Sequence, residues 1–420
     1  MSVVDTPADT PADTPADTSA RTSRLFAAGP FGERVEEARE RVAGLLRRAF
    51  EPVAQQAETE GLFPRELLAG LGAAGLFRER WARADAADPY GDPGLGVLIA
   101  EESGRLGHAG LSVGLSLHCE TVLSVLTRYG DTPLLAEYRA RALEGRLVGC
   151  LGASEPTGGS DLNGVRTVAR RTAGGWHVTG EKKYLSLGLV CDIALLLCRL
   201  DEGAGPVAGR LGLLAVPASG LTPRKRLSKA GTAALDTTWM VVDAEVPDEA
   251  LVGRPGSGLL VATWGLNHER LSIAAQAVGG AARAIGLATA HLQRREQFGG
   301  PLMDQQALRL RLAELSSRLV ALRFAVYAAA QGVPVPGACG TREIAALKTT
   351  AARFVAEATS ECMHLFGGAG YLEDETPMSR MWRDSRLARI GGGTDEMLWE
   401  LVAGGLVPDD AAYDESVDLG

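Results

Sequence analysis

Lysine is scarce in this chain. Only five of the 43 basic residues are lysines and the rest are arginines, which indicates a compositional bias of the genome rather than a chemical requirement. The 52 acidic residues give the chain a formal net charge of −9. General nucleic-acid binding depends on an excess of basic charge, so the sequence does not favour that class of function.

Several other signals are missing. The six cysteines form no CxxC pair and no Cys/His cluster at metal-ligand spacing, so we expect buried free thiols and no metal site. That usage is typical of a cytoplasmic protein. No run of about 18 apolar residues occurs, and no basic segment precedes an apolar one at the N-terminus. We therefore expect neither a membrane span nor a secretory signal.

The chain has 420 residues, enough for two or three packed units with a large core. Residues 5–18 repeat Ala-Asp-Thr-Pro, and this density of Pro and Asp cannot bury apolar surface. The repeat predicts a disordered tail over residues 1–25, and the acidic residues 409–420 predict a second tail.

Between the tails the periodicity changes twice. Residues 26–145 predict a helical domain, 146–252 a β domain and 253–408 a helical bundle. The expected helical stretches are 33–50, 64–77, 97–107, 132–145, 268–296, 303–331 and 342–366. The expected strands are 147–154, 166–172, 176–180, 192–198, 211–218 and 237–247. The fold class is therefore α+β, with an antiparallel barrel or sandwich between an N-terminal helical domain and a C-terminal four-helix bundle.

Five motifs follow one another along this frame. They are GASEPTGGSDLNG (152–164), GEKKYLS (180–186), RREQFGGPLMDQQA (294–307), LFGGAGYLEDETPMSRMWRDSR (365–386) and GGGTDE (391–396). Small residues such as those of the first motif let a backbone approach a planar ring or a phosphate, although alone they also suit a tight turn between strands. In this order the motifs resemble the acyl-CoA dehydrogenase family, over roughly residues 30–405. The resemblance implies FAD as the cofactor.

The resemblance also implies which residues meet the cofactor. Ser154 would bond the flavin pyrimidine edge, Ser160 the pyrophosphate and Ser186 the N5 edge, with Tyr184 against the ring. Arg295, Phe298 and Gln306 would grip the pyrophosphate and adenine of a neighbouring subunit's FAD, since a guanidinium suits a pyrophosphate. The full set is Leu151, Ala153, Ser154, Gly159, Ser160, Tyr184, Ser186, Arg295, Phe298, Gln306, His364, Gly367, Gly368, Thr394 and Glu396. His364 stands where many relatives carry Gln, and it suits a packed core position as well as a ligand.

The final motif lacks the base that the commonest family members carry. Their Glu lies two residues before the loop threonine, and here that position is Gly392. A subgroup resembling the long-chain and isovaleryl enzymes takes its Glu from the first long helix of the bundle, before an Arg-Leu pair. Glu269, followed by Arg270 and Leu271, fits that pattern. By itself, Glu269 would be read as a charge on a solvated helix face.

The resemblance predicts α,β-dehydrogenation of an acyl thioester, acyl-CoA to 2,3-enoyl-CoA. Glu269 would remove the α proton, and burial beside the flavin should raise its pKa towards working pH. The Gly392 N–H would help stabilise the enolate oxygen. Ser160, Arg270 and Gly391 are predicted to contact substrate, and Thr394 to cap the last helix, whose N-terminus favours an anion.

Other functions stay open at this stage. The thioester carrier could be an acyl or aminoacyl carrier protein, which Arg224, Lys225, Arg226 and Lys229 on a predicted loop could contact, although a solvated loop is the simpler interpretation. An oxygen-using oxidase or monooxygenase of the same fold, and a non-catalytic flavin-fold subunit, are further alternatives. We expect an electron-transfer flavoprotein as acceptor, a homodimer or homotetramer, and a cytoplasmic location.

Overall fold

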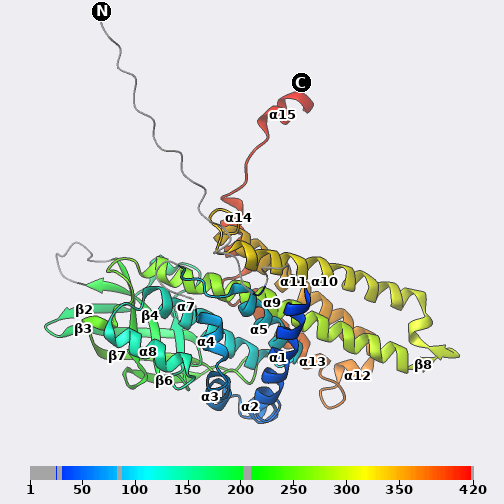
Figure 1. The fold of residues 1–420 in the computed structure, drawn as a ribbon, viewed down its shortest axis with the longest axis horizontal. Coiled ribbons are helices and arrows are strands. Elements are labelled where there is room, and N and C mark those ends of the chain that lie inside the picture. Colours follow the sequence, from blue (N-terminus) through cyan, green and yellow to red (C-terminus); the bar gives the residue numbers. More distant parts are fainter. Residues whose placement is uncertain (1–24, 26–30, 83–87, 202–209, 418–420) are drawn as a thin grey trace, which may run out of the picture.

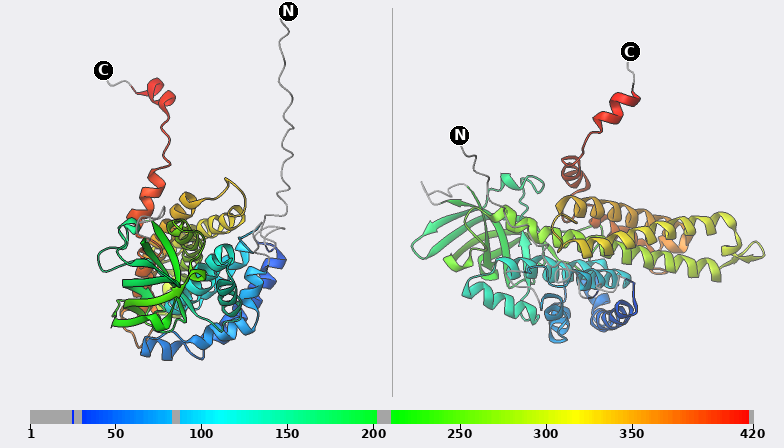
Figure 2. Two further views of the ribbon diagram at one scale, coloured as in Figure 1. Left: turned by 90° about the vertical axis from the view of Figure 1, so that its left-hand side faces the viewer. Right: turned by 45° about the horizontal axis from the view of Figure 1, so that its top comes forward.

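The computed structural model describes Leu25 and residues 31–82, 88–201 and 210–417. A β-sheet lies at one end of the molecule and three long helices extend to the other, with the N-terminal helices along one side (Figure 1). The right-hand view of Figure 2 shows the same arrangement, and the left-hand view looks onto the end that carries the sheet. This order of helices, sheet and helices confirms the predicted α+β class. The Ala-Asp-Thr-Pro repeat lies outside the described residues.

The N-terminal part is helical, as predicted. Its elements are α1 (Glu33–Phe50), α2 (Ala54–Glu60), α3 (Arg65–Ala73), α4 (Leu76–Trp81), α5 (Pro93–Arg105), α6 (Ala109–Ser116), η2 (Leu117–Val122), α7 (Leu123–Tyr129) and α8 (Pro133–Leu143). The predicted stretch 64–77 is broken into α3 and α4 at Gly75, which has a φ of 80°. Segment η2 is a turn of π-helix between α6 and α7, a type that often marks functional sites.

The middle part is one seven-stranded sheet. Its strands are β1 (Gly149–Gly152), β2 (Val168–Thr172), β3 (Gly175–Ser186), β4 (Ile193–Asp201), β5 (Leu211–Pro217), β6 (Leu221–Arg226) and β7 (Thr237–Pro247). The order is β1-β4-β2-β3-β7-β6, with β5 also paired to β4. Strands β1 and β2 pair in parallel with successive parts of β4, so the sheet is mixed rather than wholly antiparallel. The chain between them, which carries the Gly-rich motif, leaves the sheet there.

The loop predicted for Arg224, Lys225 and Arg226 is wrong, because these residues belong to strand β6 and only Lys229 of the predicted group follows it. Among the strands that the structure describes, it pairs with β7 alone, and its register shifts between Pro223 and Lys225. An edge strand tolerates Pro and carries exposed charges, so its sequence has the composition of a loop.

Three long helices dominate the C-terminal part: α9 (Gly258–Arg294), α10 (Gln306–Gly332) and α11 (Thr341–Leu365). Shorter elements accompany them in place of a long fourth helix. These are the hairpin β8 (Glu296–Gln297) and β9 (Gly300–Pro301), α12 (Gly368–Tyr371), α13 (Met378–Ser385), η7 (Arg386–Arg389), α14 (Asp395–Ala403) and α15 (Asp410–Ser416). As predicted, α11 stops before a glycine, Gly367, which has a φ of 61°.

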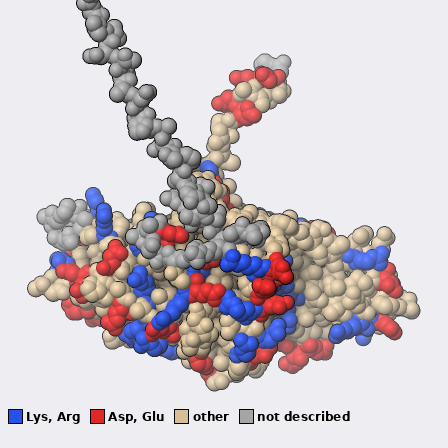
Figure 3. Space-filling view, in the orientation of Figure 1, with Lys and Arg blue, Asp and Glu red and all other residues tan. Residues whose placement is uncertain are grey.

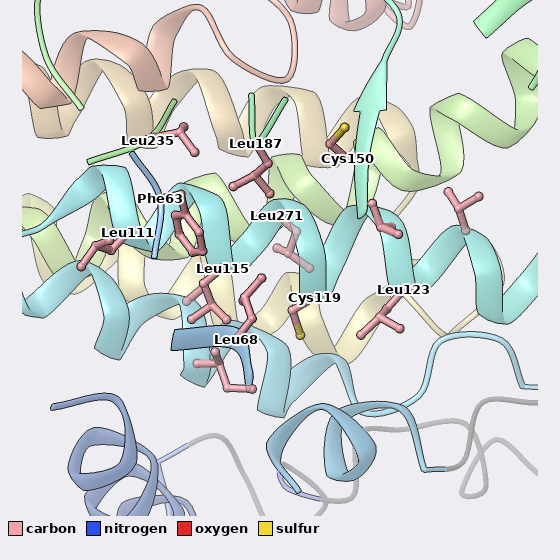
Figure 4. Packing of buried hydrophobic residues seen from close by; sticks show 14 of the residues in the cluster. Phe63, Leu68, Leu111, Leu115, Cys119, Leu123, Cys150, Leu187, Leu235 and Leu271 are labelled. Carbon is pink, nitrogen blue, oxygen red and sulfur yellow. The ribbon is translucent and has the colours of Figure 1, made fainter. Parts of the chain in front are cut away.

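Two helical stretches in the described part of the chain are long and apolar enough, by length and composition alone, to cross a membrane. They are Ala109–Tyr129 and Gly258–Arg294, and 83% and 67% of their most apolar windows are buried within the protein. Core helices pass such a test because their apolar side chains face other parts of the protein on several sides. Figure 4 shows Leu111, Leu115 and Leu123 of the first stretch packed with Leu271 of α9.

Helix α9 packs closely against α5 through glycines on both helices. A Cβ atom at Gly279 would lie 1.9 Å from the Glu101 carbonyl oxygen, and one at Gly104 would lie 2.4 Å from the Gln276 carbonyl oxygen. Only glycine permits backbones to approach this closely. Because α9 also carries Glu269, this contact fixes the predicted base relative to the N-terminal helices.

Gly279→Ala should therefore destabilise the protein. The new methyl group must push α5 and α9 apart, and overpacking of this kind costs about 1–3 kcal/mol. Chemical denaturation of the two proteins measures the difference. The matched control is Gly286→Ala on the same helix, where a Cβ would meet no atom within 4 Å. It should be neutral or stabilise by up to about 1 kcal/mol, and equal losses in both variants would contradict the contact.

Candidate active site

A cavity of about 1320 Å³ lies between the sheet, α6, α9 and the segment 387–398. It gathers residues from motifs that are far apart in the sequence. Of the predicted site residues, those that line it are Leu151, Ala153, Ser154, Gly159, Ser160, Tyr184, Ser186, Glu269, Arg270, Gly391, Gly392 and Thr394. The structure therefore brings the predicted base, the Gly-rich motif and the final loop to one space.

The other predicted cofactor residues do not line this cavity. Arg295, Phe298 and Gln306 are exposed on and beside the β8–β9 hairpin, at the end of the bundle away from the sheet (Figure 1). Phe298 is 90% exposed. His364, Gly367, Gly368 and Glu396 are also exposed. The packed-core alternative for His364 is therefore wrong.

The Gly-rich motif is anchored by the carboxylate of Glu155. One oxygen accepts hydrogen bonds from the Thr167 N–H at 2.9 Å and from the Lys182 ammonium at 2.9 Å, and the other accepts from the Arg166 N–H at 2.7 Å. Lys182 is fully buried, and its charge helps to lower the pKa of Glu155 against the opposing effect of burial. This pair fixes the base of the loop. At its tip, a Cβ at Gly159 would come within 2.9 Å of Ser154 Oγ.

Tyr184 projects from the sheet because β3 is irregular at that point. The pairing with β7 skips from Lys183 to Leu185, and Tyr184 has a φ of 64°. A bulge of this kind redirects a side chain. Tyr184 is 60% exposed and lines the cavity, and Ser186 Oγ lies 3.4 Å from Thr237 Oγ1.

Glu269 is buried rather than solvated, with an exposed fraction of 9%. Its Oε2 accepts a 3.4 Å hydrogen bond from Thr121 of the π-helical turn η2. Burial raises the pKa of Glu269, while the charges of Arg270 and Lys348 and the bond from Thr121 oppose this rise. A carboxyl group with a raised pKa in a cavity has the properties of a general base.

Two of the three glycines of the final loop are held by buried cations. Arg270 Nε donates to the Gly392 carbonyl at 2.8 Å, and Lys348 Nζ donates to the Gly393 carbonyl at 2.7 Å. Gly392 has a φ of 66°, a conformation that favours glycine. Within the part of the chain that the structure describes, the Gly392 N–H donates no hydrogen bond. It is therefore available to an oxygen in the cavity.

Gly392 and Glu269 share one space. A Cβ at Gly392 would lie 3.8 Å from Glu269 Oε1 and 3.1 Å from Ile273 Cδ1. A side chain on the loop would therefore compete with the helix carboxylate. Glycine at position 392 leaves free the space beside the carboxylate of Glu269.

Sequence reasoning missed several polar residues at the site. Lys348 lies within a helical stretch and reads as an ordinary charge, yet it is fully buried and burial lowers its pKa to about 8. Its isolation in an apolar, alanine-rich run was the available signal. Thr121 and Thr237 gave none, because threonine is common in helices and strands alike.

Comparison with known proteins agrees with this geometry. Models of the acyl-CoA dehydrogenase N-terminal, middle and C-terminal domains match residues 32–146, 150–244 and 256–407. An acyl-[acyl-carrier-protein] dehydrogenase, MbtN of Mycobacterium sp. (strain MCS), is 44% identical over 86% of this chain and 91% of its own length. An acyl-CoA dehydrogenase of Bacillus subtilis (strain 168) is 30% identical over 86% and 94%. A probable acyl-CoA dehydrogenase structure from Mycobacterium abscessus has a TM-score of 0.82 at 29% identity, covering 90% of this chain and 99% of that chain.

Proposed function

The chain belongs to the acyl-CoA dehydrogenase family, and we propose that Glu269 is the base with which it removes the α proton of its acyl thioester. Enzymes of this family are FAD-dependent oxidoreductases that act on the CH–CH group of acyl thioesters. The observation that carries the assignment is the buried carboxylate of Glu269 beside a loop that has glycine at the usual position of the base. We therefore propose that the chain belongs to the subgroup whose base lies on the first long helix of the bundle.

The cavity fits FAD. Its wall combines Gly159 of the first motif, where a Cβ would come within 2.9 Å of Ser154 Oγ, with an exposed tyrosine ring and the Ser186 hydroxyl at the end of β3. Ser154, Ser160, Tyr184 and Ser186 would hold the flavin and pyrophosphate, with Thr394 at the N-terminus of α14. When bound, FAD supplies a two-electron acceptor for the hydrogen on the β carbon.

The remaining steps belong to the protein. Glu269 takes the α proton onto its carboxylate, and Thr121 orients that carboxylate through Oε2. The Gly392 N–H donates to the thioester oxygen, on which negative charge develops as the proton leaves. Arg270 and Lys348 hold this donor in place through the loop carbonyls, and their charges keep enough of Glu269 ionised to act.

The carrier of the acyl group is proposed to be an acyl carrier protein rather than CoA. The similarity to acyl-[acyl-carrier-protein] dehydrogenases, at 44% identity, exceeds that to the acyl-CoA dehydrogenase of Bacillus subtilis, at 30%. Two lysines support an acidic partner. Lys183 of β3 lines the cavity, and Lys225 lies on β6. Both are paired with Trp239 of β7, the strand between them. Electrons would then pass to an electron-transfer flavoprotein in the cytoplasm.

Replacement of Glu269 by Gln should abolish flavin reduction. Loss of a general base costs about 10²–10⁴-fold in rate. The measurement is anaerobic bleaching of the flavin by a panel of short, branched and long acyl groups on CoA and on a carrier protein. Bleaching by the wild type alone supports the assignment, and the best carrier identifies the partner. A Gln variant that bleaches equally fast removes Glu269 from this role. A yellow protein that no thioester bleaches favours the oxygen-using alternative.

Lys348→Met should move the acidic limb of the pH profile to higher pH. The ammonium lowers the pKa of Glu269, so its removal leaves more of the base protonated at a given pH. The rate of flavin reduction should consequently fall most at low pH and recover as pH rises. Lys229→Met is the matched control, since burial also lowers the pKa of Lys229 to about 8 but its charged neighbours do not include Glu269. An equal shift in both variants would exclude a specific effect of Lys348.

The exposed residues of the bundle end are proposed to bind the FAD of a neighbouring subunit in a homodimer or homotetramer. In Figure 3 the surface over this end carries broad regions without charge, and Leu310, Val320 and Phe324 of α10 are exposed apolar side chains. Such surface is typical of subunit contacts.

Arg295→Ala should weaken FAD retention about tenfold or more, because a charged hydrogen bond to a pyrophosphate is lost. The flavin-to-protein ratio after gel filtration, with the mass by light scattering, measures this effect. The neighbouring exposed Arg294→Ala serves as control. A fully flavinated monomer would refute the shared site.

A further inference from the structure

A second cavity, of about 220 Å³, lies on the face of α9 opposite the first. Glu269, Arg270 and Ile273 line the first cavity, whereas His268, Leu271 and Ser272 line the second. Its other walls come from α5, from η2 and from the connection between α10 and α11.

His268 presents an unused acceptor to this cavity. Its Nδ1 lies 3.0 Å from the Trp264 carbonyl oxygen and must carry the proton, because a carbonyl only accepts. Burial lowers the pKa of His268 to about 4, so the ring stays neutral at pH 7 and Nε2 keeps its lone pair. That nitrogen is buried and has no hydrogen-bond partner among the described residues. An unpaired buried acceptor is costly, which indicates a missing donor.

The charges at the cavity cancel each other. Arg80 Nε and Nη2 donate to the two carboxylate oxygens of Glu120 at 2.9 and 2.8 Å, and Nη1 donates to the Tyr90 carbonyl at 2.7 Å. Both side chains are buried. The pair offers no net charge to a ligand, and Trp264, Leu271 and Ile344 make much of the remaining wall apolar. The site therefore suits an apolar group that ends in an uncharged hydrogen-bond donor.

The two cavities are separated by little more than α9. Thr341 lines both cavities. Two adjacent residues of η2 point to different cavities: Glu120 lines the second, and Thr121 donates a hydrogen bond to Glu269 in the first. Helices α6 and α9 meet beside the cavities, where the hydroxyls of Ser116 and Ser272 lie 2.7 Å apart and Gln276 Nε2 donates to the Ser112 carbonyl at 3.0 Å. To reach the second cavity, an acyl chain whose α carbon lies at Glu269 would have to displace this contact between two small side chains.

We propose that the second cavity receives the far end of the acyl chain and selects chains that end in an uncharged donor, a hydroxyl or an amide N–H, which His268 Nε2 accepts. This inference rests on the proposed function for the position of the thioester. It names the substrate class as acyl groups with a polar, neutral terminus, which plain fatty acyl chains lack.

The test measures binding without turnover. Holoenzyme carrying Glu269→Gln is titrated by calorimetry with thioesters of increasing chain length, each with and without a terminal hydroxyl, on CoA and on a carrier protein. Beyond the length at which the terminus reaches the cavity, the hydroxylated chain should bind about tenfold more tightly. Adding His268→Phe should reduce this ratio to about one.

His118→Phe is the matched control for that substitution. His118 is also fully buried, its pKa is also lowered to about 4, and its Nδ1 also lacks a partner among the described residues, but it lines neither cavity. The ratio should persist in this variant. Cys339→Phe, which fills the cavity from the α10–α11 connection, should weaken long chains more than short ones.

Equal binding of plain and hydroxylated chains at every length overturns the inference, as does a preference that survives His268→Phe. Absence of thioester binding overturns it as well. Flavin bleaching by the wild-type enzyme judges the proposed function separately, so failure of one is distinguishable from failure of the other.

Discussion

Two buried cations hold the final loop by its carbonyl oxygens, and the active site depends on this contact. Arg270 on α9 and Lys348 on α11 fix consecutive peptide units, those of Gly392 and Gly393. With the carbonyls held in this way, the Gly392 N–H has no hydrogen-bond partner among the described residues. The same charges oppose the effect of burial on Glu269. Loop geometry and base strength thus have a common origin.

Helix α9 connects these effects to the rest of the molecule. Small residues along it allow contact with α5 at the Glu101 backbone, and this contact sets the depth at which Glu269 lies. The π-helical turn η2 adds an extra residue opposite the helix, so that Glu120 meets Arg80 while Thr121 meets Glu269. A regular α-helix would not direct two adjacent side chains to these two partners in the same way.

The sequence was sufficient for most of the architecture and for the central part of the site. Long amphipathic periods located α1 and α11 closely, and alternation located β7 to the residue. It failed where local composition and environment disagree. Strand β6 is an exposed edge, so its charges resemble a loop. The run from Ala109 to Tyr129 is buried on nearly every side and shows no regular alternation of apolar and polar faces. Lys348 was missed because burial of a lysine is a tertiary property. The cofactor role of Arg295 and Phe298 was implied only by resemblance. Both side chains are exposed and lie outside the cavity of their own chain, so a single chain gives this role no support.

The move of the base from loop to helix follows from the shared space between the two positions. If both Glu269 and residue 392 were carboxylates, two like charges would meet in a buried cavity and one of them would be protonated. A residue other than glycine at 392 would also have to adopt a φ of 66° and approach Ile273. Glycine avoids both costs and exposes a backbone N–H instead of a side chain. A base on α9 is also held by a rigid helix of 37 residues. The position of a base on the loop would depend on the two hydrogen bonds that Arg270 and Lys348 donate to the loop carbonyls. The loop can then serve as a hydrogen-bond donor alone, and its requirements no longer conflict with those of the base.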